Sequence, residues 1–141
     1  MALPAQKFRE IVFQILYSSD MTGTDEEVMV PFMMGELKVT KRSVVDAYAK
    51  MHAVLGKGEE IDSLITKASK EYDFARISRV EKNIMRLGIF EMLFDDSIPD
   101  KVAMAEAIRL TRKFGTPESA QFVNAIMDAV YHERTNQPVP Q

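Results

Sequence analysis

The sequence predicts an all-α fold, and three observations support this prediction. Apolar residues recur at intervals of three and four along most of the 141-residue chain, as they do on the buried face of a helix. Capping signatures and glycine or proline breaks separate these stretches. No convincing alternation of apolar and polar residues, which marks a strand, is present. We therefore expect about seven helices joined by short loops and packed as a bundle.

The first two helices are predicted near the N-terminus. Five apolar residues form the buried stripe of the first helix: Phe8, Ile11, Val12, Ile15 and Leu16. Residues 21–24 interrupt this pattern, and Thr24 with Glu27 matches a capping box that starts a second helix. That helix is expected to run to about Leu37, with Pro31 as a kink or an early stop.

Two further helices are predicted on either side of Gly56-Lys-Gly58. Thr40 is the expected N-cap of the third helix, and its predicted buried face consists of Val44, Val45, Tyr48, Met51 and Leu55. The fourth helix is lined by Ile61, Leu64, Ile65 and Ala68. Residues 72–77 are predicted to form a connection.

The fifth predicted helix is the most apolar and should be central in the fold. Ser78 and Glu81 form a second capping box at its start. The apolar residues that leave it little polar surface are Ile77, Val80, Ile84, Met85, Leu87, Ile89, Phe90, Met92 and Leu93. Small residues predict a close approach to the sixth helix: Gly88, Ala103, Ala105 and Ala107.

The last two helices are predicted from proline and glycine signals. Pro99 fits the first turn of the sixth helix, and Gly115 ends it. Thr116 and Pro117 are the expected N-cap and first position of the seventh. Its buried stripe is Val123, Ile126, Met127 and Val130. Residues 135–141 are predicted to be a flexible tail, which leaves residues 1–134 as one domain.

Composition restricts the classes of function. The chain has no cysteine and a net charge of −3, so thiolate chemistry is excluded and any nucleic-acid contact needs a local basic patch. His52 and His132 lie on different predicted helices, and no metalloprotease, Walker or dinucleotide motif is present. The chain also lacks a long apolar span and a signal-peptide pattern. We expect a cytoplasmic protein that is not an enzyme and uses no cofactor, metal or membrane.

Three sequence blocks occur in order in the C-terminal half. They are RVEKNIMRLGIFE at residues 79–91, IPDKVAMAEAI at residues 98–108 and KFGTPESAQFVNAIMD at residues 113–128. A weaker match, Arg9-Glu10 followed by Gln14-Ile-Leu-Tyr17, lies near the start. Blocks of this order and spacing resemble the NusB family of bacterial transcription antitermination factors, whereas residues 20–77 match mainly in length and helical pattern.

The resemblance implies both a fold and a function. The fold would be two small helical bundles packed together. The function would be binding of the boxA element in nascent RNA, notably ribosomal RNA, jointly with the ribosomal protein NusE. That complex acts with RNA polymerase and the other Nus factors, and no cofactor takes part. Family members occur as monomers and as homodimers, so a homodimer is one expected state of this chain.

On the first helix, the resemblance implies RNA contacts at Lys7, Arg9, Gln14 and Tyr17. The family's helix begins with an arginine-rich stretch, but here the earlier basic positions are Pro4, Ala5 and Gln6. Fewer phosphate contacts would weaken binding and flatten its salt dependence. Tyr17 lies off the apolar stripe and could stack on an unpaired base. The structural alternatives are a solvated helix face for Lys7 and Arg9 and a packed helix edge for Tyr17.

In the C-terminal half, the resemblance implies further RNA contacts at Arg86, Phe114, Gly115, Glu118 and Phe122. It implies NusE contacts at Glu81, Glu118 and Phe122. Glu81 also completes the capping box, and Glu118 occupies a first helical turn that favours an acid. Phe122 has the spacing of a core residue. The neighbouring cations Arg79 and Lys82 share a face with Arg86, whereas Arg109, Arg112 and Lys113 are explained by the helix dipole.

Two alternative functions remain open from the sequence. The first is a helical adaptor that binds only proteins, since the helix-one start is weakly basic and the chain is acidic. The second is the RNA-binding accessory domain of a ribosomal RNA methyltransferase, which also resembles NusB. That interpretation requires a truncated protein, because 141 residues leave no room for a methyl-donor domain.

Overall fold

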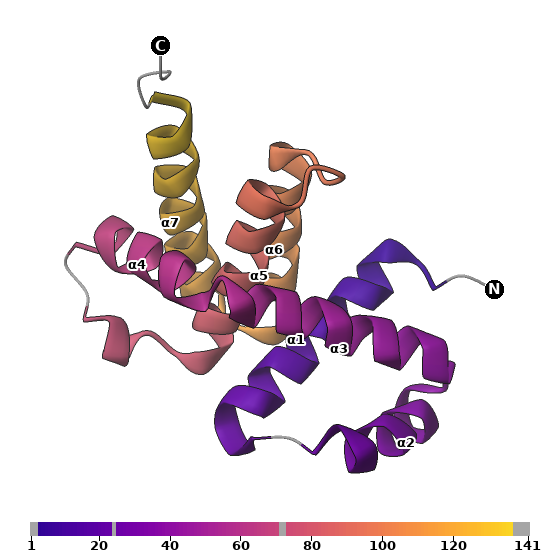
Figure 1. Cartoon of the computed structure of the whole chain (residues 1–141). Helices are drawn as coiled ribbons and strands as arrows, with labels where there is room; N and C mark the ends of the chain where they lie inside the picture. The colour runs from indigo at the N-terminus through magenta and orange to yellow at the C-terminus, as the bar shows by residue number, and fades with distance from the viewer. Residues whose placement is uncertain (1–2, 24, 71–72, 137–141) are drawn as a thin grey trace. The chain divides into compact units, whose positions relative to one another are not determined.

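The computed structural model describes residues 3–23, 25–70 and 73–136. Within these ranges the chain has seven α-helices, one short 3₁₀ helix and no strand, which confirms the all-α prediction. The chain divides into two compact units, residues 1–56 and residues 57–141 (Figure 1). We call them the N-terminal unit and the C-terminal unit and describe each by itself.

The N-terminal unit contains three helices. They are α1 (Ala5–Thr22), α2 (Glu26–Leu37) and α3 (Lys41–Gly56), and both α1 and α2 pack on α3. The predicted stripe of α1 is buried from Ile11 to Leu16, with Phe13 added to it. Phe8 is only half-buried. A hydrogen bond from the Ser43 backbone N–H to Thr40 Oγ1, 3.1 Å long, confirms Thr40 as the cap of α3.

The predicted buried face of α3 was wrong at two positions. Val45 and Leu55 are 44% and 46% exposed, whereas Ala47 and Val54 are buried. The buried face is therefore a narrow stripe centred on Val44 and Met51. Val45 and Leu55 each lie about 100° around the helix from a residue of that stripe, and this rotation carries them to its solvent side.

Helix α2 differs from the prediction at its start, whereas its end at Leu37 and the position of Pro31 inside it are as predicted. Its N-cap is Asp25, whose side chain accepts a hydrogen bond from the Glu27 backbone N–H at 3.1 Å. The predicted cap, Thr24, lies outside the described residues. Pro31 lies inside the helix, which continues past it to Leu37. Although α2 is apolar on every side, Met33 is the one residue in its described length that is buried, and Val28 and Phe32 are 64% and 57% exposed.

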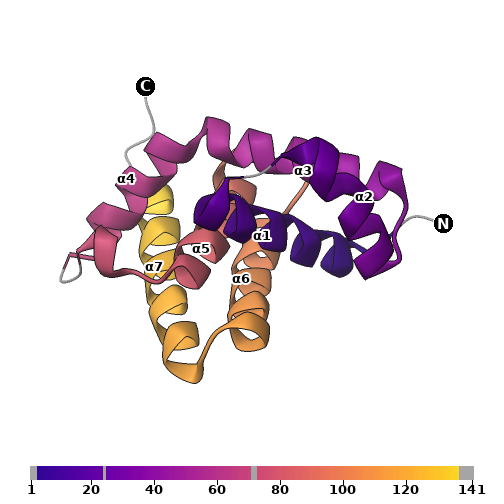
Figure 2. The ribbon, with the colours of Figure 1, turned by 90° about the horizontal axis from the view of Figure 1, so that it is seen from below.

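The C-terminal unit is built around α5. Its elements are α4 (Gly58–Ala68), η1 (Phe74–Arg76), α5 (Arg79–Phe94), α6 (Asp100–Phe114) and α7 (Pro117–Asn136). Helix α5 contacts α4, α6 and α7, so the prediction of a central helix is confirmed (Figure 2). The predicted stripe of α7 is buried as expected. On α4, Ile61 and Ile65 are buried but Leu64 and Ala68 are only half-buried.

The surface of α5 is less uniformly apolar than the sequence predicts. Asn83 and Glu91 are fully buried, while Val80, Phe90 and Leu93 are half-buried. Asn83 is tolerated inside because its side-chain amide donates a 2.8 Å hydrogen bond to the Arg79 carbonyl oxygen.

Glycine and alanine positions set the close contact between α5 and α6. A Cβ added at Gly88 would lie 3.2 Å from the Ala107 Cβ and 3.0 Å from the Met127 Cε. Ala107 is buried at this contact and Ala103 is buried as well, but Ala105 is exposed and takes no part in it. The prediction of a close approach therefore holds at Gly88 and Ala107 and fails at Ala105, which lies on the opposite side of α6.

The helix boundaries in this unit follow the predicted signals closely. Ser78 and Glu81 form the capping box, and Thr116 Oγ1 accepts a 3.1 Å hydrogen bond from the Ser119 backbone N–H. Pro99 immediately precedes α6 instead of lying within its first turn, and α7 extends to Asn136, past the predicted start of the tail at residue 135. The predicted tail residues 137–141 lie outside the described residues.

Gly115 ends α6, but for a different reason from the one expected. Its φ of −117° lies outside the left-handed region that favours glycine at helix ends. A Cβ at this position would lie 2.9 Å from the Thr111 carbonyl oxygen. The tight turn into α7 therefore needs glycine because no side chain fits there.

Candidate RNA and partner interface

Helix α1 carries four of the predicted RNA contacts. Lys7 is exposed, whereas Arg9 is 7% exposed and its neighbour Glu10 is 8% exposed. Gln14 and Tyr17 are half-buried, and the Tyr17 ring lies 6.1 Å from that of Phe13, centroid to centroid, in a tilted arrangement. Of these four residues, Lys7 is therefore exposed, Gln14 and Tyr17 are accessible in part, and Arg9 presents little surface to a ligand.

The turn between α6 and α7 brings together the second set. Phe114, Gly115 and Phe122 are half-buried, and Glu118 is exposed in the first turn of α7. Glu118 and Phe122 are one helical turn apart and so lie on one face. Lys113 Nζ lies 5.8 Å from the Phe114 ring centroid. The turn thus combines an acceptor, two aromatic rings and a cation.

Arg86 has a structural partner. Its Nε and Nη2 atoms each donate a 2.9 Å hydrogen bond to a different carboxylate oxygen of Asp62 on α4. Its Nη1 donates a 3.3 Å bond to the Asn83 side-chain oxygen. The Arg86 side chain is 14% exposed. Contact with RNA through this guanidinium would require the pair with Asp62 to open.

Glu81 takes part in the capping box of α5, and its carboxylate remains partly accessible. Its Oε1 accepts a 3.2 Å hydrogen bond from the Ser78 backbone N–H, and its own backbone N–H donates to Ser78 Oγ at 3.1 Å. The residue is half-buried. A carboxylate held in this way points in a fixed direction, so the capping role and a partner contact are compatible.

Phe74 is the residue near these positions that sequence reasoning missed. Lys82 Nζ lies 4.6 Å and Arg86 Cζ 5.8 Å from its ring centroid. It lies in η1, within a segment predicted only as a connection. A short irregular segment has no periodicity from which its packing could be inferred.

Metal and membrane features are not found in the part of the chain that the structure describes. No group of three or more His, Asp or Glu side chains is arranged there to hold a metal ion. The two histidines lie beside acids: His52 Nε2 contacts Glu26 Oε1, and His132 Nε2 lies 3.3 Å from Asp128 Oδ1. None of the described helices is both long and apolar enough to span a membrane.

Two small helical units, with no strand in the described residues, define an all-helical protein. The chain belongs to the NusB family, whose model matches residues 6–132. The match covers residues 20–77 as well, where the sequence blocks were weakest. The resemblance inferred from the sequence is therefore confirmed.

Individual relatives agree with this assignment. The chain is 37% identical over 128 residues to the transcription antitermination protein NusB of Chlamydia pneumoniae, and the match spans 91% of this chain and 80% of that one. NusB of T. maritima is similar in structure, with a TM-score of 0.80, 30% identity and 94% of both chains covered. A crystal structure of antitermination factors NusB and NusE in complex with dsRNA is also similar, with a TM-score of 0.76, 26% identity and coverage of 91% and 96%.

Proposed function

We propose that this protein is a transcription antitermination factor. It binds boxA-type RNA in nascent ribosomal transcripts together with NusE, and it acts with RNA polymerase and the other Nus factors in the cytoplasm. The observation that carries this proposal is the family match over residues 6–132. Support comes from a relative that is a transcription antitermination protein and from a similar structure of NusB with NusE and dsRNA. The binding chemistry needs no cofactor.

The proposed RNA contacts lie in both units. On α1 they are Lys7, Arg9, Gln14 and Tyr17, of which Lys7 is the exposed phosphate contact and Tyr17 the stacking ring. Around the α6–α7 turn they are Phe114, Gly115, Glu118 and Phe122. There the aromatic rings offer stacking surfaces and the Glu118 carboxylate can accept hydrogen bonds from base amino groups. We leave Arg86 out of the set because its guanidinium is paired with Asp62.

The proposed NusE contacts are Glu81, Glu118 and Phe122, all in the C-terminal unit. Two carboxylates and one aromatic ring suit a partner surface that carries cations and an apolar pocket. Glu118 and Phe122 belong to both proposed sets, so RNA and NusE would meet along the first two turns of α7.

A second candidate function is a protein-binding adaptor without significant RNA affinity. The burial of Arg9 and the net charge of −3 favour it, because together they leave little positive charge on α1 for phosphates.

The test is fluorescence anisotropy of a labelled boxA RNA, titrated with this protein alone and with NusE, at two salt concentrations. A scrambled RNA of the same length is the control. We expect selective binding that NusE strengthens. If the protein binds NusE but RNA binds neither to the protein alone nor to its mixture with NusE, the proposal is contradicted and the adaptor function is favoured.

A pair of variants locates the α1 contact. Tyr17→Ala should weaken RNA binding by about 1–3 kcal/mol, the contribution of one base–aromatic stack. Tyr17→Phe keeps the ring and should bind nearly as well as the natural protein. Equal affinity of all three proteins would remove Tyr17 from the RNA contacts.

A further inference from the structure

A groove between α6 and α7 lies directly beside the turn that joins these helices. Its volume is about 570 Å³, within the range of sites that hold small ligands. The described residues that line it are Ile108 and Arg112 of α6 and Pro117, Ala120, Gln121 and Asn124 of α7. We infer that this groove, which we call the α6–α7 groove, binds one unpaired nucleotide of the RNA strand that contacts the turn. This inference rests on the proposed function and adds a nucleotide site to it.

The helical repeat places the lining residues on one face of each helix. Ile108 and Arg112 are four residues apart on α6, and the four residues of α7 recur at intervals of three and four. Their face of α7 is not the face of Glu118 and Phe122, from which it is turned by roughly a third of a revolution. A nucleotide can therefore occupy the groove while Glu118 and Phe122 bind RNA or NusE.

The lining combines an apolar surface with two side-chain amides. Ile108 and Ala120 are half-buried and, together with the ring of Pro117, offer a surface on which the face of a base can pack. Gln121 and Asn124 are exposed and lie one turn apart at the edge of this surface. Each amide carries both donors and an acceptor, so it can form paired hydrogen bonds with the edge of a base. These are the two kinds of contact that recognise an unpaired base.

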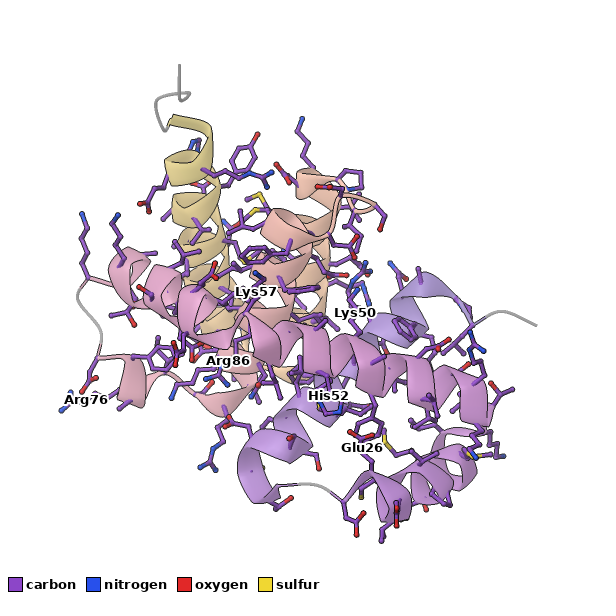
Figure 3. All side chains as sticks on the ribbon, in the orientation of Figure 1. Glu26, Lys50, His52, Lys57, Arg76 and Arg86 are labelled. Carbon is purple, nitrogen blue, oxygen red and sulfur yellow. The ribbon has the colours of Figure 1, made fainter. Side chains whose placement is uncertain are left out.

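Arg112 supplies the positive charge of the groove. It is exposed in the last turn of α6, two residues before Phe114. The dipole of α6 favours a cation there, but it does not account for the groove beside it. A planar guanidinium binds phosphate through paired hydrogen bonds. Arg86 is different, because its side chain is turned toward α4, where Asp62 accepts its hydrogen bonds (Figure 3).

The charge and position of the groove favour a nucleotide over a peptide. Arg112 is the one charged residue among the described residues that line it, and its positive sign suits a phosphate. The groove also adjoins the proposed RNA contacts, because Arg112 precedes Phe114 and Gly115 in the chain and Pro117 follows them. An RNA strand bound at the turn therefore needs little additional length to place its next nucleotide in the groove.

The first test fills the groove. Ala120→Leu keeps every charge and suits a helix, but its larger side chain takes the space of the base. The matched control is Ala129→Leu, the same change at an exposed position farther along α7. Each protein is titrated by fluorescence anisotropy, with NusE present, against boxA RNA with its natural flanks. A series of the same RNA, in which one nucleotide at a time lacks its base, is titrated in parallel. Thermal melts check that each protein is folded.

We expect one RNA position at which loss of the base weakens binding by the natural protein about fivefold or more, the contribution of one specific base contact. Ala120→Leu should bind the intact RNA more weakly by a similar factor, with an unchanged salt dependence, and should be insensitive to loss of that base. Ala129→Leu should behave as the natural protein does at every position.

The second test removes the charge of the groove. Arg112→Gln should reduce the slope of log K against log salt by about 0.7, the contribution of one single-strand phosphate contact. The control is Lys101→Gln, which removes one charge from an exposed position at the other end of α6. Its slope should equal that of the natural protein.

The remaining outcomes overturn the inference and show which step failed. If Ala120→Leu and Arg112→Gln bind every RNA as the natural protein does, the groove holds no nucleotide, although the proposed function stands. If Ala120→Leu is weaker but stays sensitive to loss of every base, no base enters the groove. A loss confined to NusE binding would assign the groove to a protein partner. If the natural protein binds none of these RNAs, the proposed function itself fails, and this inference fails with it.

Discussion

Arg86 and Asp62 join α5 to α4 through two parallel hydrogen bonds of 2.9 Å each. Their side chains are 14% and 30% exposed, so water weakens the pair only in part. We predict that Arg86→Ala or Asp62→Ala lowers the free energy of unfolding by about 2 kcal/mol, less than for a fully buried pair. Urea unfolding of both variants and of the double variant would measure the coupling energy.

A control is available in the Arg42–Asp46 pair, which is 86% and 50% exposed. Its coupling should be no more than about 0.5 kcal/mol. If Arg86 instead contacts RNA, Arg86→Ala would weaken RNA binding while Asp62→Ala would not. We expect neither variant to change RNA affinity once its stability is accounted for.

Gly88 provides a prediction about packing. Alanine is about 1 kcal/mol better than glycine in a helix, but its Cβ would meet the Ala107 Cβ at 3.2 Å. Because Ala107 is attached directly to the backbone, relief requires α5 and α6 to separate slightly. We predict that Gly88→Ala destabilises the protein by about 1 kcal/mol and Gly88→Val by more, as measured by urea unfolding.

The matched control for this prediction is Gly35 on α2. A Cβ there would meet nothing within 4 Å, so Gly35→Ala should gain about 0.5–1 kcal/mol from helix propensity alone. If Gly88→Ala raised the free energy of unfolding as much as Gly35→Ala does, the contact between α5 and α6 would accommodate the added methyl group without cost.

Glu81 allows capping to be separated from partner binding. Glu81→Gln keeps an acceptor for the Ser78 backbone N–H but removes the charge, so we predict an almost unchanged melting temperature and weaker NusE binding. Ser78→Ala does the reverse: it should cost about 1 kcal/mol in stability and leave the charge in place. Calorimetry of NusE binding, together with thermal melts, distinguishes the two. If Glu81→Gln binds NusE as tightly as the natural protein, the charge of Glu81 makes no contribution to NusE binding and its role is helix capping.

Tyr48 gives a prediction about alkaline pH. Burial raises the pKa of its phenol above the ordinary value of 10.0, and the charge of Glu26 raises the pKa further. Its hydroxyl has no hydrogen-bond partner among the described residues. The unfolded chain therefore ionises first, and the stability that neutral Tyr48 contributes below pH 10 is lost as the pH rises above that value.

We predict that Tyr48→Phe is at least as stable as the natural protein at neutral pH, by up to about 1 kcal/mol, because it removes an unpaired buried hydroxyl. Urea unfolding at neutral pH and just above pH 10 should show a smaller alkaline loss in the variant. An identical loss in both proteins would mean that other groups cause it.

Local signals predicted most of the fold. The caps at Thr40, Ser78 and Thr116 are formed by side-chain oxygens as expected. The errors arose where tertiary packing decides burial. Val45 is apolar and fits a helical stripe, yet it is exposed because the buried face of α3 is narrower than its apolar face. Ala105 is small enough for a close helix contact, yet it is exposed on the other side of α6. Asn83 shows the converse, since its burial depends on a hydrogen bond to its own helix.

The candidate site was less predictable than the fold. Motif matches pointed to Tyr17, Glu118 and Phe122 but could not show that Arg9 is buried or that Arg86 is paired with Asp62. Both facts depend on residues distant in sequence or on packing around α1. Phe74 could not be inferred either, because an aromatic residue in a short connection carries no periodic signal.

Helix α2 has a consequence for the dynamics of the N-terminal unit. Met33 is the one buried residue along its described length, so little apolar surface holds it to α3, and its apolar composition leaves Val28 and Phe32 in water. Elements with few buried contacts open at a low free-energy cost. Amide protons of α2 should therefore exchange with deuterium sooner than those of α1 and α3, which makes α2 the first segment of this unit to unfold locally and the first to be cut by a protease.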